Sequence, residues 1–293
     1  MKHRCPRERR CTYLVILEDA NDDVHALAAY LSTISVSDLE VVILDPSENE
    51  EHRRVLRWVG TYIAAKPRVD PACAAIEFAS CEKVIVAGAR VRYDANALDS
   101  VCVLLDLHEV VEPQSYLDPL PWWAGLEAGR ILVHRGLNRS SERPATFGFR
   151  KAVARYRDLQ SAEIFSATDI FVRHLPPAVD DWLRGRAKQL GHSAFFFGLP
   201  LGLILALLGG PRVGSAYGAA IAFCSLALAI RGRIGAAAFF PLRACLYAPL
   251  WLLERSISVY WALLLVLSSR RERYRRGVVD SEYAVMKPGL SAR

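Results

Sequence analysis

The sequence lacks the short motifs that identify the commonest catalytic and metal-binding sites. Its seven cysteines form no CxxC pair and no Cys/His cluster at zinc spacing, and its seven histidines are scattered. It has no GxSxG nucleophile elbow, no glycine-rich phosphate loop and no HExxH helix. Internal repeats are absent, and the one low-complexity stretch is arginine-rich. No function can therefore be assigned from a motif of this kind, and we expect the cysteines to be reduced thiols.

A secretory signal is also missing. The apolar run after the basic start, Tyr13–Leu17, is shorter than the hydrophobic region of a signal peptide, and acidic residues follow it at once. We therefore expect a domain that faces the cytosol.

The net charge of +6 is concentrated in a few basic runs. These runs are MKHRCPRERR at the start, Arg184 to Lys188, and RRERYRR near the end. A nucleic-acid-binding protein would carry basic residues and aromatics together on a folded face, whereas these runs flank hydrophobic segments. We expect them to contact anionic lipid headgroups and not nucleic acid.

The last hundred residues are far more apolar than the rest. Residues 1–191 carry charge at the density of a soluble domain, but 192–211 and 213–230 are almost free of it. Eighteen helical residues rise about 27 Å, close to the thickness of a bilayer core. With the turn sequence Gly209–Arg212 between them, these segments predict a transmembrane helical hairpin over 192–230.

The next apolar stretch, 234–269, is interrupted by Arg243 and Glu254-Arg255, and prolines 241 and 249 would kink it. A single crossing would place the basic cluster 270–276 outside, against the positive-inside tendency. We expect 231–276 to form interfacial or re-entrant amphipathic helices, followed by a tail over 277–293. The residues expected at headgroup depth are Trp251, Tyr260 and Trp261. A third membrane span is the alternative. The whole pattern predicts a multi-pass protein of the cytoplasmic (inner) membrane.

Short apolar runs alternate with helical patterns in the first 191 residues. The predicted strands are Tyr13–Leu17, Leu39–Leu44, Val84–Ala87 and Glu109–Glu112. The predicted helices are Val24–Thr33, Glu50–Ala65, Ala72–Ala79 and Ala97–Leu107. This alternation is typical of an α/β fold with a mostly parallel sheet flanked by helices. Such sheets bind ligands at the carboxyl ends of their strands, which here carry Glu18, Asp45 and Gly88–Arg90.

Several segments, in this order, resemble a bacterial, membrane-attached branch of the family-2 glycosyltransferases, which have the GT-A fold. They are LDPS at Asp45, VIVAGARVRYDANAL from Val84, VEPQSY from Val111, PLPWW from Pro119, PATFGFRK from Pro144 and FVRHLPP from Phe171. The hydrophobic tail with its basic end matches that branch as well. The resemblance covers nearly the whole chain. It implies a nucleotide-sugar donor and a lipid or envelope-glycan acceptor.

The resemblance also suggests roles for individual residues. Asp45 would bind the base or ribose of the nucleotide, and Glu18 is a further candidate for nucleotide binding. A carboxylate that receives hydrogen bonds from the next helix explains Asp45 equally well. Trp122 and Trp123 would stack on a sugar or lipid acceptor, or would fill the core.

The sequence departs from the family where the chemistry occurs. The family holds a divalent cation with closely spaced aspartates after the third strand, whereas this chain has Gly88, Ala89 and Arg90. The nearest acid, Asp94, is predicted to start the next helix. We therefore expect no metal site here, and Arg90 with Arg92 could neutralise the diphosphate instead.

The acid that activates the acceptor hydroxyl in the family is not recognisable either. Glu163 and Asp169 are the candidates, together with Asp158. Three hypotheses about the function remain open. The chain is a divergent but active transferase, a pseudoenzyme that binds a partner such as another glycosyltransferase, or a membrane scaffold or transporter accessory that shares the α/β design.

Overall fold

The chain forms two compact units. The first comprises Met1–Pro177 and Ala227–Tyr247, and the second comprises Ala178–Leu226 and Ala248–Arg293. A computed structural model describes residues 10–17, 23–34, 39–47, 49–64, 71–137, 146–156, 162–180, 182 and 198–268. The domain boundaries predicted from the sequence, 1–191, 192–230, 231–276 and 277–293, stay a prediction.

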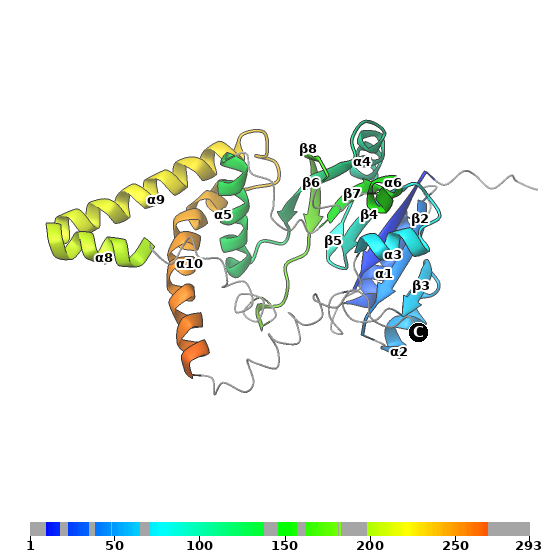
Figure 1. The fold of residues 1–293 in the computed structure, drawn as a ribbon, viewed down its shortest axis with the longest axis horizontal. Helices are drawn as coiled ribbons and strands as arrows, with labels where there is room; N and C mark the ends of the chain where they lie inside the picture. Colours follow the sequence, from blue (N-terminus) through cyan, green and yellow to red (C-terminus); the bar gives the residue numbers. More distant parts are fainter. Residues whose placement is uncertain are drawn as a thin grey trace, which may run out of the picture. The chain divides into compact units, whose positions relative to one another are not determined.

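The first unit is built on one eight-stranded sheet (Figure 1). Its strands are β1 (Cys11–Ile16), β2 (Leu39–Asp45), β3 (Thr61–Ala64), β4 (Lys83–Gly88), β5 (Val91–Arg92), β6 (Val110–Leu117), β7 (Thr146–Arg150) and β8 (Ile164–His174). They lie in the order β3-β2-β1-β4-β7-β6-β8-β5. β7 is antiparallel to both neighbours and β5 is antiparallel to β8, so the other strands all point the same way. The expected mixed α/β fold with a mostly parallel sheet is confirmed.

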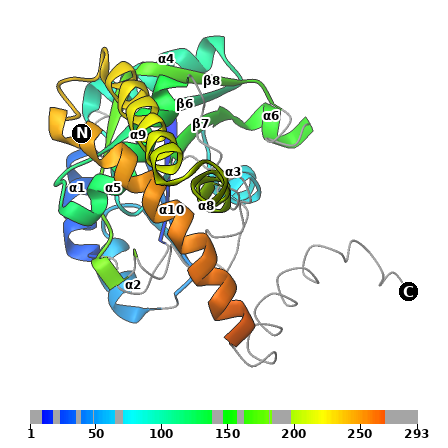
Figure 2. The same cartoon turned by 90° about the vertical axis from the view of Figure 1, so that its left-hand side faces the viewer.

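Both faces of the sheet are covered by helices, which are α1 (Val24–Ile34), α2 (Glu50–Leu56), α3 (Pro71–Phe78), α4 (Ala95–Leu107), α5 (Trp122–Gly136) and α6 (Lys151–Tyr156). One buried cluster joins β1 residues such as Tyr13 and Val15 to α1, α2 and α4. The other joins Leu14 to α3 and α6. Figure 2 shows α1 and α3 on opposite sides of the sheet. Successive residues of β1 thus enter different cores, which explains why its sequence is apolar without alternation.

The helix predicted over Glu50–Ala65 is wrong in its second half. Helix α2 ends at Leu56, and Thr61–Ala64 forms strand β3, parallel to β2. Gly60 lies so close to β2 that a Cβ atom there would fall 2.7 Å from the carbonyl oxygen of Val41. A helix could not pass this point, and the residues that follow favour an extended strand.

The segment Ala227–Tyr247 packs against α5 in the first unit. It contains the end of helix α9 (Pro211–Arg233) and the start of helix α10 (Leu242–Ser268). Arg135 of α5 donates from Nε to the carbonyl oxygen of Gly232 at 2.8 Å. The ring of Phe239 stacks on Phe171 of β8 at 4.1 Å between centroids and lies 4.9 Å from that of Tyr116. This segment is therefore part of the α/β core.

The second unit contains a hairpin of two helices, α8 (Gly198–Gly209) and most of α9. The turn between them lies where the sequence predicts it, with Gly210 at a φ of +79°. The two helices approach closely at small residues, since a Cβ atom on Gly214 would lie 2.6 Å from that of Ala206.

Within the described residues, α9 is the one helix long and apolar enough to cross a membrane, with a mean hydropathy of 1.8 over its best window. Helix α8 has 12 residues and rises about 18 Å, well short of a bilayer core of about 30 Å. Residues 192–197 lie outside the described part of the chain. The expected multi-pass arrangement is therefore not supported.

The described residues between 231 and 268 include one long helix, α10. Leu242–Ser268 is one continuous helix of 27 residues that contains Pro249. Trp251, expected at headgroup depth, is 3% exposed. The side chains of Tyr260 and Trp261 lie outside the described set.

Candidate functional site

The carboxyl edge of the sheet brings together strand ends from distant parts of the sequence. β1 is followed by β2 on one side, while its other neighbour is β4, so the strand order reverses between β1 and β4. In open α/β sheets a crevice for ligands forms outside the carboxyl ends at such a switch point. The structure places Asp45 and Gly88–Arg90 at this edge, as the sequence predicts. Glu18 lies outside the described residues.

Asp45 ends β2 and is completely buried. Its Oδ1 accepts hydrogen bonds from the backbone nitrogen of Ser47 at 2.8 Å and from its hydroxyl at 2.6 Å. Its Oδ2 accepts from the Tyr62 hydroxyl at 2.7 Å and lies 3.1 Å from Nδ1 of His52. The carboxylate thus joins β2, α2 and β3.

Burial opposes ionisation of Asp45, but the hydrogen bonds from Ser47 and Tyr62 and the nearby His52 outweigh it and lower its pKa. In return, burial and the Asp45 carboxylate raise the pKa of Tyr62. These contacts give Asp45 a structural role. It contacts the next helix through the side chain of His52 and does not cap that helix, whose first turn is capped by Asn49. Nucleotide binding by Asp45 stays a prediction.

The turn after β4 is fixed by its backbone. The Ala89 nitrogen donates to the Ile16 carbonyl of β1 at 3.0 Å, and the Leu175 nitrogen donates to the Arg90 carbonyl at 2.9 Å. Asp94 caps α4 by accepting from the Ala97 nitrogen at 2.7 Å, which confirms that it starts that helix. The backbone of Arg90 is therefore held at the switch point by a turn that is bonded to both β1 and the residue after β8.

Arg92 is held against the protein itself. One guanidinium nitrogen donates to the carbonyl oxygens of Ala89 and Val91, at 2.5 and 2.9 Å. Its Cζ lies 4.8 Å from the ring centroid of Tyr30, a cation–π distance. This geometry ties Arg92 to the β4–β5 turn.

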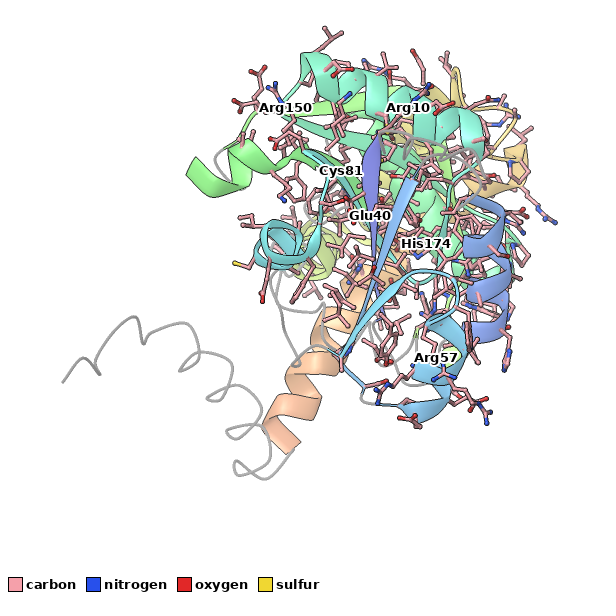
Figure 3. The ribbon with its side chains drawn as sticks, turned by 90° about the vertical axis from the view of Figure 1, so that its right-hand side faces the viewer. Arg10, Glu40, Arg57, Cys81, Arg150 and His174 are labelled. Carbon is pink, nitrogen blue, oxygen red and sulfur yellow. The ribbon has the colours of Figure 1, made fainter. Side chains whose placement is uncertain are left out.

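The end of β8 adds charged groups that the sequence did not suggest. His174 pairs with Val91 and Arg173 pairs with Arg92 in the β5–β8 ribbon. Arg173 donates from Nε to the Asp118 carbonyl at 3.0 Å and lies 3.1 Å from its carboxylate. Figure 3 shows His174 well below the opposite edge, where Arg10, Cys81 and Arg150 lie.

The pKa of His174 is lowered to about 4. Burial is the main cause, Glu127 of α5 opposes it, and Arg90 and Arg92 add to it. The imidazole is therefore neutral at pH 7 and shares its surroundings with both arginines.

The two tryptophans begin α5. Trp122 is 64% exposed, and its ring stands edge-on to that of Trp123 at 5.8 Å between centroids. Trp123 is partly buried and donates from Nε1 to the Pro177 carbonyl at 3.3 Å. Trp123 therefore ties α5 to the chain after β8, while Trp122 offers an open ring face.

The structure does not bring the two candidate acids to the carboxyl edge. Glu163 is exposed just before β8, at the opposite edge of the sheet. Asp169 is exposed in a bulge of β8, where the pairing with β6 jumps from Ala167 to Phe171. Its charge acts on Arg135 at the far end of α5. Asp158 lies outside the described residues.

Metal ligands are not assembled in the described part of the chain, which contains no group of three or more His, Cys, Asp or Glu side chains that could hold an ion. The acids that do reach the region of His174 are Asp118 and Glu127, and each is paired with an arginine. Sequence reasoning missed them, and His174, because strand pairing between residues far apart in the chain places them there.

The comparisons with known proteins identify no family. No family model matches the chain, and no curated protein matches it. Among solved structures it is similar to the mannosyltransferase PcManGT from Pyrobaculum calidifontis in complex with GDP-Man and Mn²⁺, at 16% identity and a TM-score of 0.47 over 87% of this chain and 88% of that one.

Two further structures are similar over shorter regions. One is a mycobacterial protein, at 10% identity and a TM-score of 0.39 over 60% of this chain and 71% of that one. The other is CMP:2-keto-3-deoxy-manno-octonic acid synthetase complexed with CTP, at 9% identity and a TM-score of 0.37 over 61% of this chain and 98% of that one. At these TM-scores the likeness supports no conclusion about function.

Proposed function

We propose that the chain is a divergent, membrane-attached family-2 glycosyltransferase of the GT-A type. It would bind a nucleotide sugar at the carboxyl edge of the sheet and transfer the sugar to a lipid or envelope-glycan acceptor. The observation that carries this proposal is the position of Arg90, on the bonded turn that follows β4 at the switch point. The resembling family has its metal-binding aspartates at the same place in the sequence.

In this proposal the positive charge of Arg90 stabilises the diphosphate leaving group, as the divalent cation does in the resembling family. As the acceptor oxygen bonds to the anomeric carbon, the bond from that carbon to the diphosphate breaks and negative charge develops on the leaving group. A guanidinium fork matches phosphate oxygens and stabilises that charge. Arg92 contributes its charge from beside Tyr30, and the open face of Trp122 suits a sugar or lipid.

The base that accepts the acceptor's proton is not assigned to Glu163, which lies at the other edge. Asp118 is the more suitable carboxylate, because it directly follows β6 at the carboxyl edge and is half-exposed.

A pseudoenzyme is the alternative, favoured by one observation. The Asp45 carboxylate, expected to hold the base or ribose, has its hydrogen bonds satisfied inside the protein. Such a chain would keep the fold and its attachment to the cytoplasmic membrane. It would act as the partner of an active glycosyltransferase. Attachment through α9 is common to both proposals and rests on its apolar, little-buried surface.

The test is a titration of the full-length protein in detergent with UDP- and GDP-sugars, in the presence of a chelator. We expect saturable binding without a divalent cation. Replacing Arg90 with Ala should weaken it about 10- to 100-fold, since charge-assisted bonds to phosphate are lost.

Arg10→Ala is the matched control. It removes the same charge from the opposite edge, where Arg10 lies 3.9 Å from Asp99 on the surface. Equal loss in both variants would show a general charge effect and remove Arg90 from the site. Absence of binding at millimolar sugar nucleotide would overturn the transferase proposal. Binding without turnover, together with co-purification of a second glycosyltransferase, would favour the pseudoenzyme.

A further inference from the structure

Helix α10, drawn in orange in Figure 1, exposes only apolar side chains over half of its length. Between residues 244 and 257 its buried residues are Ala244, Cys245, Ala248 and Trp251. The exposed residues of the same stretch form the α10 stripe, and each is 50–62% exposed: Leu246, Leu250, Leu253 and Ile257. A helix side that faces water normally carries polar residues. The α10 stripe is therefore a surface that an apolar neighbour covers.

The spacing of the α10 stripe is that of a coiled-coil seam. Leu246 and Leu253 are seven residues apart, and so are Leu250 and Ile257. In heptad notation Leu250 and Ile257 take position a, while Leu246 and Leu253 take position d. The helix extends to Ser268. The same spacing continues in the sequence at Tyr260, Leu264 and Leu267. The repeat thus spans about three heptads, which is the length typical of a coiled coil.

The residues beside the stripe favour a second helix over lipid as its neighbour. Glu254 and Ser256 take the flanking positions e and g, and both are half-buried. A helix that lay in hydrocarbon would carry the Glu254 carboxylate into the bilayer, which is costly. A packed helix covers the a and d residues and leaves e and g at the rim, where polar residues are usual.

A second copy of this chain supplies a matching helix. In a two-fold pair of parallel helices each a residue meets the same residue of the partner, and each d residue does likewise, so the stripe is complementary to itself. The stripe carries no charge that would repel its copy. Leucine at d together with Ile257 at one a position suits a two-stranded coiled coil. The 27 residues of α10 rise about 40 Å, long enough for such a seam.

We propose that α10 is the dimerisation helix of this protein. Two copies pack their α10 stripes against each other as a parallel, two-stranded coiled coil. The proposal goes beyond the function proposed above and does not depend on it, because the partner is the chain itself and the contact involves no sugar nucleotide.

The first test is the mass of the full-length protein in a mild detergent, measured by density-matched sedimentation over a range of concentrations. We expect twice the 32.6 kDa of one chain. Leu250→Ala combined with Leu253→Ala should raise the dissociation constant of the dimer at least about tenfold, since each chain loses two apolar contacts. Leu207→Ala combined with Leu208→Ala is the matched control. These two leucines are 75% and 84% exposed on α8, and their loss should leave the mass unchanged.

The second test is made in the membrane, where detergent cannot separate the copies. A short bismaleimide should join Leu253→Cys to its copy, because residues at d face each other across the seam. Leu252→Cys, one position away on the half-buried side, should not be joined. The parent chain gives the background from its own exposed thiols, such as Cys224.

Each outcome supports or contradicts the dimer. A single-chain mass without a crosslink at Leu253→Cys would mean that lipid covers the stripe, and the proposal would be wrong. A dimer that is unchanged by the two alanines would use another surface, which also overturns it. A crosslink at Leu253→Cys but not at Leu252→Cys supports the proposal even if detergent separates the copies. Equal crosslinking of both variants contradicts the a/d register. If the double alanine variant does not fold, the crosslinking pair decides.

Discussion

At the scale of single residues, Asp45 is the clearest case of a side chain whose contacts define its role. It is fully buried, and replacing it with Asn leaves the hydroxyl of Tyr62 and the ring of His52 without their charged acceptor. We expect Asp45→Asn to lower the free energy of unfolding by about 2–4 kcal/mol, measured in urea without any nucleotide. Asp99→Asn, at an exposed pair with Arg10, should cost less than about 0.5 kcal/mol. Equal stability of the two variants would contradict the structural role of Asp45.

The pH dependence of that stability has a definite sign. The pKa of Asp45 is lower in the folded chain than in the unfolded one, so the folded state binds the proton less tightly. Its contribution is fully present above the ordinary value of 3.8 and is lost as the pH falls below that value. The difference in stability between the parent and Asp45→Asn should therefore shrink on acidification through this range.

Residue patterns predict the sheet's inner strands but not its long-range pairings. β1, β2 and β4 follow from their apolar runs, because both faces of each strand are covered. The sequence predicts helix for the residues of β3 because they continue an apolar stripe, and the close approach of Gly60 to Val41, which marks the break, has no local signal. The pairing of β5 with β8, which places His174 beside Arg90 and Arg92, depends on residues about eighty positions apart and has no local signal.

At the scale of elements, the crossing of α5 and α9 depends on two glycines. A Cβ atom on Gly232 would lie 2.0 Å from the Leu132 carbonyl oxygen, and one on Gly136 would lie 2.2 Å from that of Leu228. We expect Gly232→Ala to destabilise the protein by about 1–3 kcal/mol, because backbone atoms cannot move aside locally. A Cβ atom on Gly218, in the same helix, would have no neighbour within 4 Å. Gly218→Ala should therefore be neutral or stabilise the protein by up to about 1 kcal/mol. Thermal unfolding in one detergent compares them, and equal melting temperatures would contradict this crossing.

At the scale of the whole molecule, the α/β unit is not continuous in sequence. The change in composition predicts a domain boundary after residue 191, whereas Ala227–Tyr247 belongs to the first compact unit. That segment supplies the Gly232 carbonyl to Arg135, the Phe239 ring to Phe171, and a Tyr247 ring that leaves no room for a side chain at Gly125.

A chain ending at Gly191 should therefore be less stable than one ending at Tyr247, although the second adds a largely apolar hairpin. Removing the segment exposes α5 and β8 to solvent, and the Phe240 ring of the segment, which is 2% exposed, contributes about 2–3 kcal/mol by its burial. We expect the shorter chain to melt at least several degrees lower in the same detergent and to be cut sooner by protease within α5. Phe239→Ala in the full chain should shift the melting temperature in the same direction without any truncation. Identical melting of the two truncated chains would mean that the α/β domain ends before the apolar helices, as the composition alone suggests.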